Sequence, residues 1–207
     1  MPRSRIVPFT HFSPVSLYTP VGDRKYVNVS ERAALLSRLS ALSRKRRLFV
    51  LTLMWTGARV SEVLALCPSS FQLDAHVVAI NTLKRRCHVV REIPIPGYLL
   101  RELDEEFSLR QNQRLAATAH EPLWKFHRVT AWRFLKDAAR RAGIEGVRAS
   151  PRGLRHAFGV GTLAAGVPLN IVQRLLGHSS IATTTIYTEA TGPEQQALVA
   201  RFWRQTV

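Results

Sequence analysis

Residues 150–159 of this 207-residue chain read SPRGLRHAFG and predict the start of a helix with an ionisable face. The serine is a suitable N-cap, and the proline is a favoured first helical residue. Arg152, Arg155 and His156 follow at the i, i+3 and i+4 spacing, which places them on one face of that helix. Taken alone, such a triplet is usually a solvated basic face, so its meaning depends on the rest of the chain.

A second stretch, LLGHSSIATTTIYT at residues 175–188, adds a histidine and a tyrosine. Apolar residues before it repeat at helical spacing, and Gly177 is the expected C-cap of that helix. His178 follows at once, and Tyr187 stands nine positions later. Each also has an ordinary structural interpretation, as a loop histidine near helix carbonyls and as a packing aromatic with a hydrated hydroxyl.

A third stretch lies far upstream, TGARVSEVLAL at residues 56–66. Gly57 ends an apolar segment, residues 48–55, which is too short for a bilayer because a spanning helix needs about 20 residues. Arg59 then stands at the start of the next helix, where free backbone amides and the helix dipole favour phosphate. Glu62 either orients Arg59 or forms only an i, i+3 ion pair with it.

Between these stretches, apolar residues at 77–80 and 89–95 predict a β-hairpin. Its tip reads KRRCH and offers Lys84, Arg85 and Arg86 to a polyanion. An ammonium can give up a proton where an arginine cannot, so Lys84 is the candidate general acid. Arg85 and Arg86 are candidates for DNA contact. Because they directly follow Lys84, the hairpin register that would place the lysine is left open.

In this order and at these spacings, the three stretches resemble the catalytic domain of the tyrosine recombinases, the phage integrase family. The resemblance covers roughly residues 29–203. It implies a fold that is mainly α-helical with a small antiparallel β-sheet (α+β), and a DNA strand transferase that needs no metal or other cofactor. The implied catalytic residues are the paired Arg59 and Arg155, the hairpin Lys84, His178, and the nucleophile Tyr187.

One position departs from the family pattern, because Arg152 stands where the family usually has a histidine. That histidine is the usual proposal for helping the tyrosine lose its proton. Arginine cannot act as a general base at neutral pH, since its pKa exceeds about 12, although it can lower the pKa of a nearby tyrosine. The neighbouring His156 or an ordered water is then the alternative proton acceptor, and the sequence leaves that choice open.

The resemblance implies a chemical route that these residue types can perform. Tyr187 attacks a phosphodiester, cations hold its non-bridging oxygens, and Lys84 protonates the leaving 5′-oxygen. The product is a 3′-phosphotyrosyl link, which conserves bond energy for rejoining. The function expected is site-specific DNA recombination. Two alternatives stay open: a type IB topoisomerase, and a non-catalytic DNA-binding relative, which Arg152 favours.

The composition agrees with double-stranded DNA as a partner. The chain has 30 Lys+Arg against 14 Asp+Glu, a formal net charge of +16 and a pI near 11.3. Such a surplus predicts affinity for a polyanion that falls with salt. A basic run supplies further candidates for DNA contact, Lys45, Arg46 and Arg47. With two cysteines and no secretory or membrane segment, we expect a cytoplasmic, nucleoid-associated protein.

The predicted organisation along the chain is uneven. Residues 1–28 are proline-rich without periodicity, which predicts an extended arm or linker. Residues 29–207 are the predicted catalytic domain, ending in an apolar tail helix at 194–203. In the family this segment commonly docks on a neighbouring protomer, so the resemblance implies a homotetramer assembled on DNA. No full N-terminal core-binding domain is expected, since fewer than 30 residues precede the catalytic region.

Weaker signals predict the remaining elements. Ser30 is a candidate cap for the first helix, and residues 99–107 are amphipathic. Residues 129–142 predict a helix with Trp132 facing the core. The polar stretch 108–122 is expected to be a loose connection.

Overall fold

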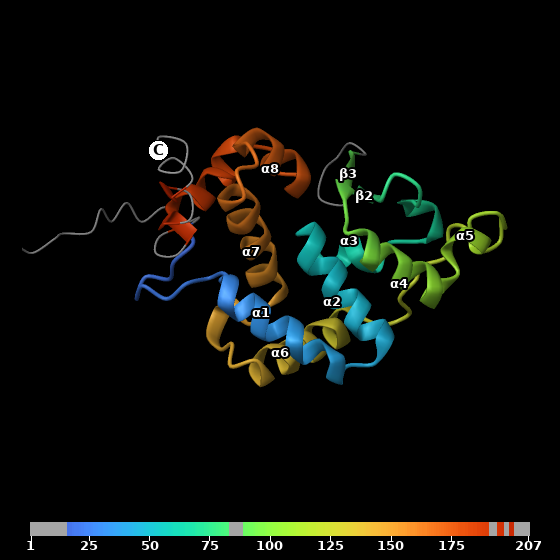
Figure 1. Ribbon diagram of the computed structural model, residues 1–207, viewed down its shortest axis with the longest axis horizontal. Helices are drawn as coiled ribbons and strands as arrows, with labels where there is room; N and C mark the ends of the chain where they lie inside the picture. Colours follow the sequence, from blue (N-terminus) through green and yellow to red (C-terminus); the bar gives the residue numbers. More distant parts are fainter. Residues whose placement is uncertain (1–15, 83–88, 191–193, 197–198, 201–207) are drawn as a thin grey trace, which may run out of the picture.

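The computed structural model of the chain describes residues 16–82, 89–190, 194–196 and 199–200. Within these ranges the fold is mainly α-helical with a small antiparallel sheet, which confirms the predicted fold class (Figure 1). The hairpin residues Lys84, Arg85 and Arg86 lie outside the described residues, as does much of the predicted tail helix. In the part of the chain that is described, no helix is long and apolar enough to cross a membrane.

The elements have the following bounds. The α-helices are α1 Val29–Arg38, α2 Arg44–Thr56, α3 Val60–Leu64, α4 Gly97–Phe107, α5 Leu109–Asn112, α6 Arg128–Arg141, α7 Pro151–Ala164 and α8 Leu169–Leu176. The strands are β1 Phe71–Gln72, β2 Val77–Asn81 and β3 Val90–Pro94. Short 3-10 turns are η1 Leu39–Ala41, η2 Pro68–Ser70, η3 Gly146–Arg148, η4 Ile181–Thr183 and η5 Thr185–Glu189.

Helix α2 occupies the middle of the fold, and all its side chains from Leu48 to Met54 are buried. In Figure 1, α7 and α8 lie on one side of it and the sheet with α4 and α5 on the other. Gly57 ends α2 in the left-handed region, at a φ of 61°. A Cβ there would come within 2.6 Å of Phe158 on α7, so the turn and the close approach both require glycine.

The sheet has the strand order β1-β2-β3 and confirms the predicted hairpin. Strands β2 and β3 pair antiparallel, with Val78 opposite Ile93, and both side chains are buried. Alternation along β3 also turns Arg91 inward, so the sheet brings an arginine to the interior. Strand β1 was not predicted, because two residues are too few to show an alternating pattern.

The N-terminal segment differs from the expected extended arm in residues 16–28. These residues fold back through a turn closed by a bridge between Tyr18 and Arg24. Leu17 and Tyr26 are fully buried in one hydrophobic cluster with Tyr187. Buried residues at irregular spacing give no periodic signal, which is why the sequence did not reveal this packing.

The predicted cap of α1 was wrong. Asn28, and not Ser30, is the N-cap, and its side chain accepts a hydrogen bond from the Glu31 amide at 2.8 Å. The Glu31 carboxylate accepts in return from the Asn28 amide at 2.9 Å, which completes a capping box. Both residues can cap a helix, and the glutamate three positions on decides for the asparagine.

Two further predictions about surface segments were wrong. Trp132 on α6 is 42% exposed, because it lies beside the buried stripe of that helix, and the Lys136 ammonium stands 4.7 Å from the ring centroid. The stretch 108–122 is not a loose connection, since it contains α5 and buries Leu109 and Ala119. Short elements of this kind lack the length over which helical periodicity can be recognised.

Candidate functional site

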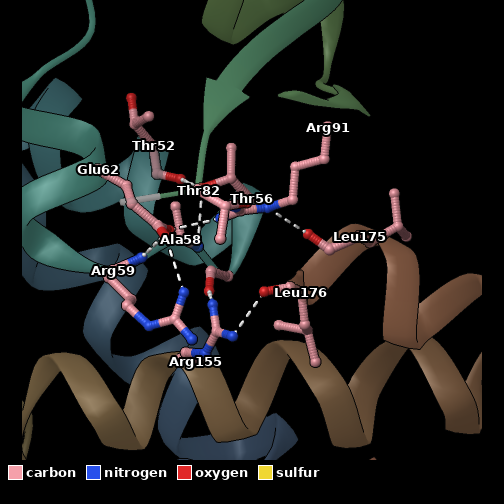
Figure 2. Close-up of polar contacts among 11 residues, drawn as sticks. Thr52, Thr56, Ala58, Arg59, Glu62, Thr82, Arg91, Arg155, Leu175 and Leu176 are labelled. Carbon is pink, nitrogen blue, oxygen red and sulfur yellow. Dashed lines mark hydrogen bonds and ion pairs between the residues drawn. The ribbon is translucent and has the colours of Figure 1, made fainter. Parts of the chain in front are cut away.

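Arg155 joins the helices that surround the site (Figure 2). Its buried guanidinium donates from Nη1 to the Gly57 carbonyl at 2.7 Å and from Nη2 to the Leu176 carbonyl at 2.6 Å. These carbonyls lie at the C-terminal ends of α2 and α8, where a cation is favoured by the helix dipole. Ser150 caps α7 as predicted and accepts from the Gly153 amide, which fixes the start of the helix that carries Arg155.

Arg59 is the N-cap residue of α3, and Glu62 holds it from within the same helix. The Arg59 amide donates to Glu62 Oε2 at 2.9 Å, and Nη1 donates to Oε1 at 2.7 Å. Burial alone would raise the pKa of Glu62, but hydrogen bonds from Arg91 and Arg59 outweigh it and hold that pKa below its usual value. Glu62 therefore forms the i, i+3 ion pair with Arg59 and also orients its guanidinium, so the two interpretations of the sequence describe one interaction.

Arg91 is a residue of the site that the sequence analysis missed. It lies on β3, is 6% exposed, and donates to Glu62 and to the Leu175 carbonyl. A signal was present, because two-residue alternation puts Arg91 on the same strand face as Ile93 and Ile95. An arginine on the apolar face of a strand has to find buried partners.

His178 follows directly from Gly177, which ends α8 in the left-handed conformation as predicted. Its Nδ1 lies 2.9 Å from Thr184 Oγ1, so Nε2 is the ring nitrogen left for a second partner. Burial, and then the nearby Arg155 and Arg59, lower the pKa of His178 to about 3, so the ring is neutral at pH 7. If Nδ1 accepts from the threonine hydroxyl, Nε2 carries the proton and can donate to a phosphate oxygen.

Tyr187 lies in η5 and is 2% exposed. Its ring stacks on His178, with centroids 6.2 Å apart and an interplanar angle of 17°, and lies 5.9 Å from the His156 ring. Burial raises the pKa of Tyr187 to about 12, against the opposing charges of Arg155, Arg152 and Arg59. The cations therefore act in the direction that a tyrosine nucleophile requires.

Arg152 and His156 form a pair one turn apart on α7. Arg152 Nε donates to His156 Nε2 at 3.3 Å. Burial, and then the charges of Arg152 and Arg155, lower the pKa of His156 to about 4, so the ring is neutral at pH 7. Its Nδ1 is buried and has no hydrogen-bond partner among the described residues.

Six of the predicted site residues come together where α3, α7, α8 and η5 meet. They are Arg59, Arg152, Arg155, His156, His178 and Tyr187. Glu62 lies beneath them as a buried support. The hairpin candidates Lys84, Arg85 and Arg86 fall outside the described residues, so their place in the site stays a prediction.

The basic run at the start of α2 is not part of this cluster. It lies at the opposite end of a 13-residue helix from Gly57, about 20 Å away at 1.5 Å per residue. Arg47 pairs with Glu102, and Lys45 Nζ lies 3.9 Å from the carboxylate of Glu106. The guanidinium of Arg46 stands 5.7 Å from the Phe134 ring centroid. DNA contact by these three side chains stays a prediction.

The site thus gathers three arginines and two histidines around one buried tyrosine. Residues 25–193 match the model of the phage integrase family, and the chain belongs to that family. The tyrosine recombinase XerA of Pyrococcus furiosus is 34% identical over 158 residues, which are 75% of this chain and 54% of that protein. The chain spans about half the length of the curated relatives it matches.

Solved structures show the same fold at lower identity. The crystal structure of XerA recombinase superposes with a TM-score of 0.70 and 24% identity over 86% of this chain and 64% of that one. The XerH site-specific recombinase, in a pre-cleavage complex with its difH substrate, gives a TM-score of 0.68 and 18% identity, over 90% of this chain and 59% of that one.

Proposed function

We propose that this chain is the catalytic part of a site-specific DNA recombinase that cuts and rejoins DNA through a 3′-phosphotyrosyl intermediate. The observation that carries the proposal is the placement of Tyr187 among three arginines whose charges all favour its ionised form. Tyrosine recombinases are among its relatives, and the XerH site-specific recombinase, which has the same fold, is bound to its difH substrate in a pre-cleavage complex.

Arg59 and Arg155 are the proposed ligands of the two non-bridging oxygens of the scissile phosphate. Each guanidinium has five N–H donors, and the contacts to Glu62 and to backbone carbonyls occupy only some of them. Burial and the nearby Arg59 lower the pKa of Arg155 to about 10, so Arg155 is cationic at pH 7. Two fixed cations stabilise the charge that builds on these oxygens in the transition state, and Nε2 of His178 adds a donor.

In the proposed cleavage step, the Tyr187 oxygen bonds to phosphorus while the bond from phosphorus to the 5′-oxygen breaks. The tyrosine loses one proton and the leaving 5′-oxygen gains one. Lys84, outside the described residues, is the proposed donor of that proton. In rejoining, a free 5′-hydroxyl attacks the phosphotyrosine and releases Tyr187, so the bond energy is conserved.

The contact between Arg152 and His156 argues against His156 as the acceptor of the Tyr187 proton. A guanidinium only donates, so it occupies the lone pair on Nε2 of His156. The neutral ring then carries its proton on Nδ1 and has no lone pair left for the tyrosine proton. We therefore assign that proton to a water molecule and give Arg152 an electrostatic role, lowering the pKa of Tyr187 against the effect of burial.

The proposed partner is double-stranded DNA, to which a net charge of +16 is suited. Assembly as a homotetramer on that DNA through the C-terminal segment and a nucleoid-associated location in the cytoplasm are parts of the same proposal. A type IB topoisomerase activity and a non-catalytic DNA-binding role are the outcomes that would replace it.

A suicide-substrate assay tests this function. The protein is incubated with nicked duplexes taken from the DNA that flanks its gene, and adducts that survive denaturation are measured. We expect an adduct with the wild type, none with Tyr187→Phe, and a loss of 100-fold or more, about the effect of removing one transition-state donor, with Arg59→Ala or Arg155→Ala. Binding without an adduct would favour the non-catalytic role, and relaxation of supercoils without site preference would favour the topoisomerase.

A further inference from the structure

Arg91 connects three separate segments of the chain through one buried guanidinium (Figure 2). Nη2 lies 2.5 Å from Oε2 of Glu62 on α3, Nη1 donates to Thr82 Oγ1 at 2.8 Å, and Nε donates to the Leu175 carbonyl of α8 at 2.9 Å. The Arg91 side chain is 5% exposed and that of Glu62 is fully buried. Hydrogen bonds to charged groups are strongest where water is excluded.

The contacts of Arg91 require a guanidinium. Three different nitrogens donate to three acceptors in separate segments of the chain, whereas a lysine carries all its donors on one atom at the end of an unbranched stem. Gly177 makes room for this arrangement, since a Cβ at that position would lie 3.1 Å from Arg91 Nη1 and 3.2 Å from Thr82 Oγ1. A side chain at position 177 would therefore press against the arginine and the threonine.

Glu62 is shared by two arginines. Its Oε2 receives the Arg91 guanidinium and the Arg59 amide, and its Oε1 receives Arg59 Nη1. Because the carboxylate is buried and held from both sides, its position depends on Arg91, and the position of the Arg59 guanidinium depends on the carboxylate.

Two buried arginines donate hydrogen bonds to the last two carbonyls of α8. Arg91 binds the Leu175 carbonyl and Arg155 binds the Leu176 carbonyl. The last four carbonyls of a helix have no partners within it, so these contacts satisfy groups that would otherwise need water. His178 is two residues after Leu176, so the arginines from β3 and α7 hold the backbone directly before it.

We propose that Arg91 is a positioning residue for the phosphate-binding groups: through Glu62 it fixes Arg59, and through the Leu175 carbonyl it fixes the segment that carries His178. The catalytic consequence rests on the proposed strand-transfer function, whereas the geometric part does not. Arg91 acts through these neighbours, because three of its five N–H donors go to them and its side chain is 5% exposed.

Two substitutions at Arg91 and a matched control test the proposal. Arg91→Met removes the charge and the donors, Arg91→Lys keeps the charge, and Arg110→Met makes the same change in an exposed ion pair with Asp74. On a nicked suicide duplex we expect Arg91→Met to form the covalent adduct about 100-fold more slowly, the loss that follows a misplacement of roughly 1 Å. Arg91→Lys should fall between, and Arg110→Met should match the wild type. An unchanged rate in Arg91→Met would overturn the proposal.

A substrate with a bridging sulfur at the 5′ position separates the phosphate-binding groups from the general acid. A thiolate leaves without being protonated, because thiols have a pKa of about 8.5. The loss in Arg91→Met should persist on this substrate. Recovery of the wild-type rate would show that Arg91 acts on the leaving group, and would overturn its assignment to Arg59 and His178.

A measurement without DNA tests the geometric part alone. The pKa of His178 is followed by NMR titration of its ring protons in the wild type and in Arg91→Lys, which keeps the charge but loses the contact to the Leu175 carbonyl. We expect the pKa to rise toward its ordinary value, because a released α8 end exposes the ring to water. An unchanged pKa would overturn the link to α8. If the wild type forms no adduct, the proposed function fails, and this titration still decides the role of Arg91.

Discussion

The ring of Tyr187 rests directly on Gly159 of α7. A Cβ at position 159 would lie 2.4 to 2.6 Å from three atoms of that ring, which is closer than side chains approach. Gly159 is in the middle of a helix with a negative φ, where glycine costs up to about 1 kcal/mol relative to alanine. The glycine is therefore explained by the space it leaves for the tyrosine, and not by the backbone.

Gly159→Ala should displace Tyr187 from this position. The ring would become more hydrated, so the pKa of Tyr187 should fall from about 12 toward its ordinary value. Ultraviolet titration of tyrosinate, with Gly159→Ala/Tyr187→Phe subtracted as the reference, measures this pKa. An unchanged value would show that α7 moves and the ring does not.

Gly161→Ala is the matched control on the same helix. A Cβ at position 161 would meet only the Arg32 guanidinium, at an ordinary 3.6 Å. We expect this variant to gain about 0.5 to 1 kcal/mol in the free energy of unfolding, because alanine favours a helix, and to leave the pKa of Tyr187 unchanged. Urea denaturation of both variants checks the contrast, since Gly159→Ala should be less stable than the wild type.

Glu62→Gln should be severely destabilising. The substitution leaves Arg59 and Arg91 facing each other without their shared carboxylate, and breaking a buried pair costs about 3 to 5 kcal/mol. Glu105→Gln removes a carboxylate from an exposed pair with Arg44 and should cost less than about 1 kcal/mol. Equal losses in urea denaturation would contradict the view that Glu62 supports the site from beneath.

Acid should destabilise the fold partly through His156. Its pKa is about 4 in the folded state against 6.5 when unfolded, so between these values the unfolded chain binds the extra proton. The free energy of unfolding therefore falls as the pH drops from about 7 to 4, by up to about 3 kcal/mol from this residue. His156→Gln still offers an oxygen to Arg152 but does not titrate. Its stability should fall less over that range, and an equal fall would assign the acid effect to other groups.

The order of the elements could be predicted from the sequence because their signals are local, whereas the candidate site residues were assigned from the resemblance that three stretches carry together. Ser150 and Pro151 predicted the start of α7, and Gly57 and Gly177 predicted the ends of α2 and α8. Arg91 and Gly159 could not be assigned roles, because their partners lie far away in the chain, at Glu62 and Tyr187. The packing of Leu17 and Tyr26 against Tyr187 was missed for the same reason.

Arg152→His restores the residue that the family pattern has at this position. We expect the adduct to form as fast as in the wild type or faster, since an imidazole can accept the tyrosine proton that Arg152 cannot. The new histidine also titrates, so the rate should fall toward acid through its pKa within about pH 5 to 8, whereas Arg152→Lys, which stays charged, should show no such fall. Single-turnover rates across that range measure both. A severe loss in Arg152→His at every pH would show that the guanidinium held by His156 has an independent role, because the histidine supplies the proton acceptor and only the fixed charge is missing.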